Sequence, residues 1–225
     1  MSKLIPTSLI TPSHVSCSND ILRWADEYLA KPHPRLGRDG AVCPFVPPSI
    51  RSNVFFLAIH AEVDDTTTIE EIEALLASYV DVFFATEPTG EPERLLKTFL
   101  PAFPQMSPQR AFILDEVHAR MKSFFVQQGM MIGQFHPLCQ AVAARNPDFP
   151  NKISPVPLFA LRHIAVHDIL FLSSRRAWFE RYQSLFAEKF DAGHVSNEHG
   201  FVEIYNRAKR LFATSTDDAG GEREC

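Results

Sequence analysis

The chain has 225 residues, a net charge of −5, 45% hydrophobic and 22% charged residues, all ordinary for a globular protein. It has no basic run and no apolar run of membrane-span or signal-peptide length, so we expect a cytoplasmic protein that binds neither nucleic acid nor membrane. The four cysteines form no C-x-x-C pair, so free thiols are expected.

The first half of the sequence alternates between helical patterns, one strand and proline-rich stretches. A helix is predicted over 18–29, capped by Ser18. Residues 31–52 are rich in Pro and Gly, so we expect a loop without regular structure. A buried strand follows over 54–63, and Thr68 with Glu71 forms a capping box at the start of an amphipathic helix. Residues 86–107 form a second proline-rich excursion with one helical turn near Leu95.

The second half has clearer boundaries. A helix is predicted from Ser107 to about Gln128, with Gly129 as its stop. Strands are predicted over 130–136 and 158–165, and helices over 174–190 and 197–212. The segment 167–172 fits either a strand or a helix.

This order of elements favours one α+β domain over 18–213, with a flexible N-terminus over 1–17 and a disordered tail over 214–225. We expect a mixed or antiparallel sheet of about four strands with helices on one side. No G-x-G-x-x-G follows a strand and no phosphate-binding loop motif is present, which disfavours common nucleotide folds. The 19 phenylalanines suit either an ordinary aromatic core or a pocket for a planar apolar ligand.

His136 is the first candidate site residue. It ends a predicted strand, and Pro137 biases it toward an extended backbone and stops the strand there. A ring fixed in this way suits a metal ligand or a base, and one axial histidine is all that haem iron requires. A structural histidine beside a proline turn is the alternative.

Cys43 is the second candidate, in the segment Val42-Cys43-Pro44-Phe45-Val46. Its thiolate suits a nucleophile or an iron ligand, whereas most free cysteines are small buried hydrophobic residues. A cysteine enzyme that pairs Cys43 with a histidine is therefore one of the hypotheses.

Arg162 and His163 lie inside the predicted strand 158–165, and strand alternation places them on opposite faces. An arginine in an apolar strand needs a partner. Arg162 suits a bidentate contact with a carboxylate, such as a haem propionate or an amino-acid substrate. A salt bridge to Asp115, Glu116 or Asp168 explains it equally well.

Several segments together resemble an uncharacterised domain family of bacteria and fungi, which often occurs near biosynthetic genes. The resemblance covers about residues 17–190 and rests on Cys43-Pro44-Phe45, Gly133-Gln134-Phe135-His136-Pro137, Asn146-Pro147-Asp148-Phe149-Pro150 and the stretch from Pro155 to Leu172. The C-P-F and H-P elements are in turn similar to haem-dependent N-hydroxylases of the guanitoxin-biosynthesis type.

This resemblance implies a haem b enzyme, an oxidoreductase of specialised metabolism that acts on a small, amino-acid-derived substrate by oxidation or by N–O or N–N chemistry. It implies His136 as the metal ligand, Cys43 and Phe45 as a pocket wall, and Arg162 as a carboxylate anchor. Phe135 and His163 complete the expected cofactor-binding set, and His136, Arg162 and Cys43 the catalytic set. The alternative is a non-catalytic domain that binds a small molecule or a protein, with a structural His136; a homodimer is left open.

Overall fold

A computed structural model describes residues 12–144, 146–197 and 200–213, and every structural statement below concerns these residues. The chain divides after His163 into two compact units, which are described separately. The predicted α+β class is confirmed. The first unit contains the sheet, and the second contains helices.

The sheet of the first unit has four strands in the order β1-β2-β6-β3. β1 (Phe55–Ile59) pairs in parallel with β2 (Thr98–Ala102). β6 (Leu158–His163) lies antiparallel to both β2 and β3 (Met130–Phe135). The sheet is therefore mixed, as predicted.

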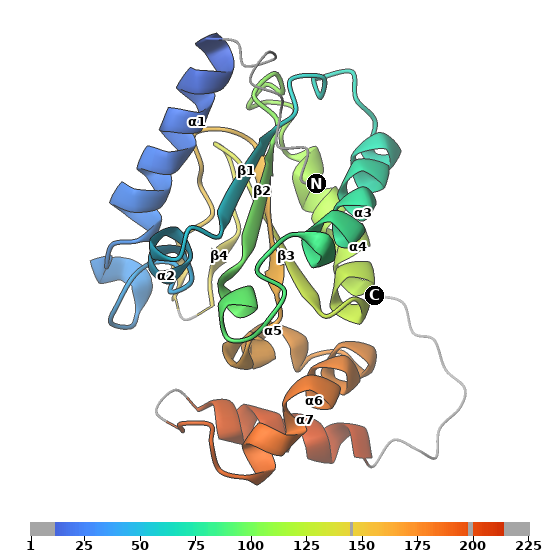
Figure 1. The fold of residues 1–225 in the computed structure, drawn as a ribbon. Helices are drawn as coiled ribbons and strands as arrows, with labels where there is room; N and C mark the ends of the chain where they lie inside the picture. Colours follow the sequence, from blue (N-terminus) through green and yellow to red (C-terminus); the bar gives the residue numbers. More distant parts are fainter. Residues whose placement is uncertain (1–11, 145, 198–199, 214–225) are drawn as a thin grey trace. The chain divides into compact units, whose positions relative to one another are not determined.

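Helices cover both faces of this sheet, so the expectation of helices on one side is wrong (Figure 1). α3 (Ile69–Ala85) and α4 (Ile113–Gln127) pack on one face, around a large core that includes Phe99, Phe159 and Leu161. α1 (Pro12–Trp24) packs on the other face, against a smaller cluster that includes Leu100, Leu158 and Ala160, and α2 (Val46–Arg51) lies beside β1. Alternating strand residues are apolar on both faces, and each face therefore requires a cover.

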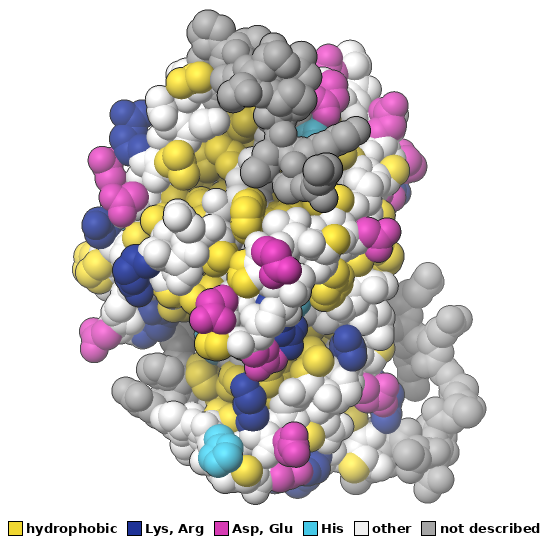
Figure 2. All heavy atoms as spheres, in the orientation of Figure 1, with side chains coloured by type: hydrophobic (Ala, Val, Ile, Leu, Met, Phe, Trp, Pro, Cys, Tyr) yellow, Lys and Arg dark blue, Asp and Glu magenta, His cyan; other side chains and the backbone are white. Residues whose placement is uncertain are grey.

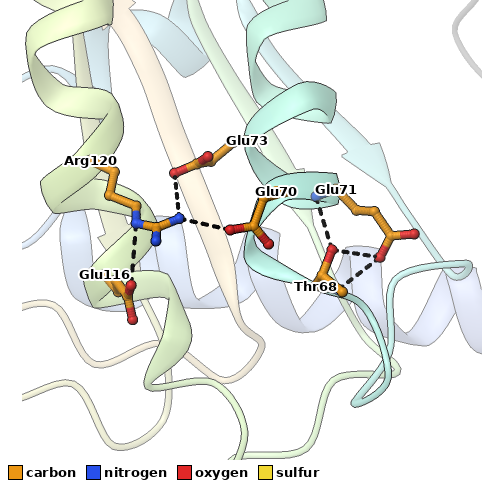
Figure 3. Close-up of polar contacts among 6 residues, drawn as sticks. All are labelled: Thr68, Glu70, Glu71, Glu73, Glu116 and Arg120. Carbon is orange, nitrogen blue, oxygen red and sulfur yellow. Dashed lines mark hydrogen bonds and ion pairs between the residues drawn. The ribbon is translucent and has the colours of Figure 1, made fainter.

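Polar contacts fix the start of α3 and tie it to α4 (Figure 3). Thr68 accepts a hydrogen bond from the Glu71 backbone, and the Glu71 carboxylate accepts from the Thr68 backbone, which confirms the capping box. From α4, Arg120 reaches Glu70 at 3.0 Å and Glu73 at 3.5 Å, and it also pairs with Glu116 at 3.2 Å. These pairs are exposed, so they orient the two helices more than they stabilise them.

The excursion predicted over 86–107 contains the central strand β2, which sequence reasoning missed. A short helical turn at Glu93–Leu96 confirms the turn predicted near Leu95. Pro101 argued against a strand here, because proline has no backbone N–H, and a central strand donates N–H groups to the neighbouring strands on both of its sides. β2 accommodates it: Thr98, Phe99 and Ala102 have partners in β6, whereas Pro101 has none in β6 and is paired only with Ala58 of β1.

Two further stretches that were expected to be irregular carry structure. Within 31–52 the chain forms a short turn at Pro34–Leu36 and then α2, whose prolines occupy the first turn, where no N–H is needed. β4 (Val142–Ala143) and β5 (Asn146–Pro150) form a small hairpin. The π-helical turn Ala25–Leu29 continues α1, so a helix over 18–29 is confirmed. It begins earlier, at Pro12, so Ser18 lies inside the helix and the predicted cap at Ser18 is wrong.

The second unit consists of a short turn at Val166–Asp168 and the helices α5 (Ile169–Leu172), α6 (Arg176–Asp191) and α7 (Phe201–Ala213). The segment 167–172 is thus helical. The unit is held by aromatic packing, in which Phe190 stacks on Tyr205 with ring centroids 3.9 Å apart. The Tyr182 hydroxyl donates to the Val166 carbonyl oxygen and ties α6 to the start of the unit.

The surface of the protein and the two ends of the chain test the expectations about charge, membrane crossing and flexible termini. Charged side chains of both signs are interspersed with hydrophobic ones across the visible face (Figure 2). Among the described helices, none combines the length and the apolar character needed to cross a bilayer. α1 begins inside the segment 1–17 that was expected to be flexible, while residues 1–11 and the tail 214–225 lie outside the described residues.

Candidate functional site

His136 lies directly after β3 and its side chain is only 1% exposed, so the predicted place at a strand end is confirmed. Three backbone contacts hold the residue. Its N–H donates to the Lys152 carbonyl oxygen at 3.4 Å, and its own carbonyl accepts from Cys139 at 3.1 Å and from Ser154 at 3.4 Å. The imidazole therefore has a fixed backbone anchor.

The ring of His136 meets a carboxylate from α4. Nε2 lies 3.2 Å from Oδ2 of Asp115, which stands in the first turn of that helix with its side chain 46% exposed. The other carboxylate oxygen accepts from Gln134 Nε2 at 2.9 Å, and Lys152 Nζ donates to Gln134 Oε1 at 3.2 Å. Both carboxylate oxygens of Asp115 thus have a partner, and the contact with Asp115 orients the His136 ring toward the α4 face of the sheet.

The second ring nitrogen of His136, Nδ1, is buried and has no hydrogen-bond partner within the described part of the chain. An ionised carboxylate can only accept, so Nε2 is the donor in this contact, and in the neutral ring Nδ1 then presents a lone pair. A buried polar atom without a partner is costly and points to a missing ligand or water.

Cys139 completes this group. Its side chain is fully buried, and Sγ lies 3.9 Å from Oδ1 of Asp115. One ligand atom each of Asp115, His136 and Cys139 lies within 4.8 Å of the other two. Carboxylate, imidazole and thiolate are the donors of zinc and iron sites in proteins.

Burial shifts the pKa values of three groups near Asp115. Burial lowers the pKa of Lys152, and the nearby Cys139 and Asp115 only partly oppose the shift. Burial also raises the pKa of the Cys139 thiol, against a backbone hydrogen bond from Ala141. On α4, burial with the cations Lys152 and Lys122 lowers the pKa of His118 to about 4.

The other predicted site residues do not join His136. The guanidinium of Arg162 lies 3.9 Å from the ring centre of Phe45, and Nη1 donates to the His163 carbonyl oxygen at 2.9 Å. Burial raises the pKa of Cys43, and the Phe45 backbone hydrogen bond and the nearby Arg162 charge oppose this shift. Cys43, Phe45 and Arg162 thus form a group of their own.

The sheet separates this group from His136. Arg162 pairs with Met131 near the start of β3, whereas His136 follows Phe135, which pairs with Leu158. At about 3.3 Å per residue, the four positions from Leu158 to Arg162 span roughly 13 Å. Arg162 alternates with Leu161 and therefore lies on the α1 face, while the contact with Asp115 places the His136 ring on the α4 face.

Phe135 and His163 also lie apart from the imidazole. Phe135 makes an edge contact with Trp24 of α1, at a centroid distance of 5.4 Å. His163 lies between Phe83 and Phe84 on the α3 face, at 4.9 and 5.6 Å, so the predicted opposite facing of Arg162 and His163 is confirmed. Burial lowers the pKa of His163 to about 4, with help from Arg94 and Lys97.

An open groove of about 540 Å³ lies beside Pro137, the residue that follows His136. It is bounded by Pro137 and by residues 153–155 on one side, and by Trp24 and Tyr28 with three charged side chains on the other: Asp20, Arg23 and Glu27. Trp24 Nε1 donates to the Ile153 carbonyl oxygen at 2.9 Å and joins the two sides.

Sequence reasoning missed Asp115 and Cys139. Asp115 gave no signal, because an acidic residue in the first turn of a helix is explained by the helix dipole alone. For Cys139 a signal existed, since His136-Pro137-Leu138-Cys139 places two metal-ligand types three residues apart.

The comparisons with known proteins identify the family. Residues 18–197, which make up most of the chain, match the family described as "Domain of unknown function (DUF6875)". Searches of curated proteins and of solved structures found no match. The chain therefore belongs to the DUF6875 family.

Proposed function

We propose that the chain is an iron-dependent enzyme that oxidises a small, amino-acid-derived molecule in specialised metabolism, with His136 as the iron ligand. The environment of one imidazole carries this proposal. The ring is buried, one nitrogen faces the Asp115 carboxylate and the other has no described partner. Histidines that bind metals usually donate their second ring N–H to a carboxylate or a carbonyl, as this ring does.

Haem b is the form of iron that the resemblance implies, and the described residues fit it only in part. His136 fits an axial ligand, because a buried nitrogen lacks a partner. The expected wall and anchor do not fit the same haem, because Cys43, Phe45 and Arg162 lie together on the opposite face of the sheet. Iron bound at His136 would supply the activation of oxygen or peroxide.

The groove supports an amino-acid-derived substrate. Trp24 and Tyr28 offer flat apolar surfaces, while Asp20 and Glu27 are anionic and Arg23 is cationic. Arg23 pairs with Asp20 within the groove, so a zwitterionic substrate would exchange this ion pair for contacts with its own carboxylate and ammonium. Pro137 and Ser154, which bound the groove, are the chain neighbour and a backbone partner of His136, whereas the imidazole itself meets Asp115 on the α4 face and does not line the groove.

The test is the metal content and the absorption spectrum of the purified protein. We expect about one iron per chain after reconstitution, either with iron(II) without oxygen or with haem. His136→Ala should lose it, and His194→Ala, which changes an exposed histidine, should keep it. A protein that takes up neither form of iron contradicts the proposal.

A non-catalytic binding domain is the rival function, and the open groove favours it, since it requires no metal. In that case His136→Ala would keep the fold and the affinity for a small ligand in the groove. Loss of groove binding should then follow from Trp24→Ala instead.

A further inference from the structure

We infer that Asp115, His136 and Cys139 form a binding site for one discrete divalent transition-metal ion of the zinc or iron(II) class. The inference rests on the proposed function for its use of His136 as a ligand, and it names the cofactor class of that site. It differs from the haem expectation in requiring two more protein ligands, from α4 and from the turn after β3.

The geometry is close to that of a bound ion. Bond lengths of about 2.0–2.3 Å place the ligand atoms of a tetrahedral site roughly 3.3–3.8 Å apart. The atoms of Asp115, His136 and Cys139 already lie within 4.8 Å of one another, and the carboxylate lies 3.2 Å from the imidazole and 3.9 Å from the thiol. A contraction of up to about 1.5 Å therefore closes the site.

The charges also suit a divalent ion. A carboxylate and a thiolate together bring two negative charges, which balance a 2+ ion when the imidazole is neutral. Lys152, the nearest cation in this network, donates to Gln134 and not to the carboxylate. Asp115 therefore remains oriented toward His136 and Cys139.

The burial of the donors argues for a built site. His136 and Cys139 are 1% and 0% exposed. The ring nitrogen that faces the carboxylate is Nε2, so Nε2 is the ligand atom of this site and its hydrogen moves to Nδ1, which has no partner in the described ranges. Three protein ligands leave at least one coordination position for water or substrate, which is the pattern of catalytic metal sites.

Cobalt(II) is the probe, because thiolate ligation to cobalt gives a charge-transfer absorption in the near ultraviolet. We expect the intact protein to bind one cobalt(II) per chain with this absorption. Cys139→Ser should abolish the band, and Cys43→Ser should retain it. Asp115→Asn should weaken binding at least ~10-fold, while Glu116→Gln on the same helix should leave it unchanged.

The outcomes separate this inference from the proposed function. Cobalt binding without the thiolate band, or a band that survives in Cys139→Ser, overturns the inference. A haem spectrum that depends on His136 but not on Asp115 or Cys139 also overturns it and supports the proposed function. The thiolate band in a protein that never oxidises a substrate with iron bound supports the metal site and contradicts the proposed function.

Discussion

Asp115 and His136 meet at the edge of the sheet, where Oδ2 of the helix residue lies 3.2 Å from Nε2 of the residue that ends β3. The side chain of His136 is buried, with 1% of its surface exposed, whereas the side chain of Asp115 is 46% exposed. The pair therefore joins a buried ring to a solvent-accessible charge, and it also joins α4 to β3. Its removal should affect stability as well as chemistry.

We expect Asp115→Ala to lower the free energy of unfolding by about 1–3 kcal/mol, because Gln134 Nε2 and His136 Nε2 both lose their acceptor. Glu116→Ala, the next residue on α4, breaks only an exposed pair with Arg120 and should cost less than about 0.5 kcal/mol. Chemical denaturation of both variants measures the difference. Equal losses would mean that the buried network contributes nothing specific.

Lys97 gives a second prediction, because its ammonium group caps α3. The side chain is 1% exposed, and Nζ donates to the carbonyl oxygens of Phe83 and Thr86, each at 2.6 Å. Lys97→Met keeps the apolar stem but removes both donors, so we expect a loss of about 1–3 kcal/mol in the free energy of unfolding. Lys31→Met, at an exposed position, is the control, and a thermal melt that moved equally in both variants would refute the capping role.

The sequence predicted the elements that carry strong local signals and missed those set by tertiary contacts. The capping box at Thr68, the stop at Gly129 and the strand before His136 are local, and all three are confirmed. β2 was missed because its evidence lies in its neighbours, which tolerate Pro101. The same reason explains Asp115, whose meaning depends on a ring that stands 21 residues later.

We expected the predicted site residues to line one common site, and the sequence alone could not test this hypothesis. Short motifs say which residues have a special backbone, but not which face of a sheet they share. Here strand alternation and register place Arg162 and His136 on opposite faces and at opposite ends of β6 and β3. Only the long-range pairing of the strands contains that information.

His163 predicts how stability depends on pH. Burial lowers the pKa of this histidine to about 4 in the folded protein, while an unfolded histidine titrates near about 6.5. Between these values the unfolded chain binds a proton that the folded chain does not, so stability is complete above about pH 6.5 and falls as pH decreases toward about 4.

His163→Leu removes this proton linkage. We expect the variant to lose less stability than the parent protein between about pH 7 and about pH 5, by on the order of 1 kcal/mol. Urea unfolding at both pH values measures the two differences, and carboxylates that titrate in both proteins cancel. An identical pH dependence in the two proteins would show that His163 titrates normally in the fold.

The thiols provide the last prediction, which decides the cysteine-enzyme hypothesis. Burial raises the pKa of Cys43, and it raises that of Cys17 to about 11, so neither is a reactive thiolate near neutral pH. We expect iodoacetamide to modify both cysteines slowly in the native protein and rapidly in denaturant, as followed by mass spectrometry of the peptides. A cysteine nucleophile requires the opposite pattern, with fast modification of Cys43 alone in the folded chain. The slow pattern would therefore contradict the hypothesis of a cysteine enzyme built on Cys43.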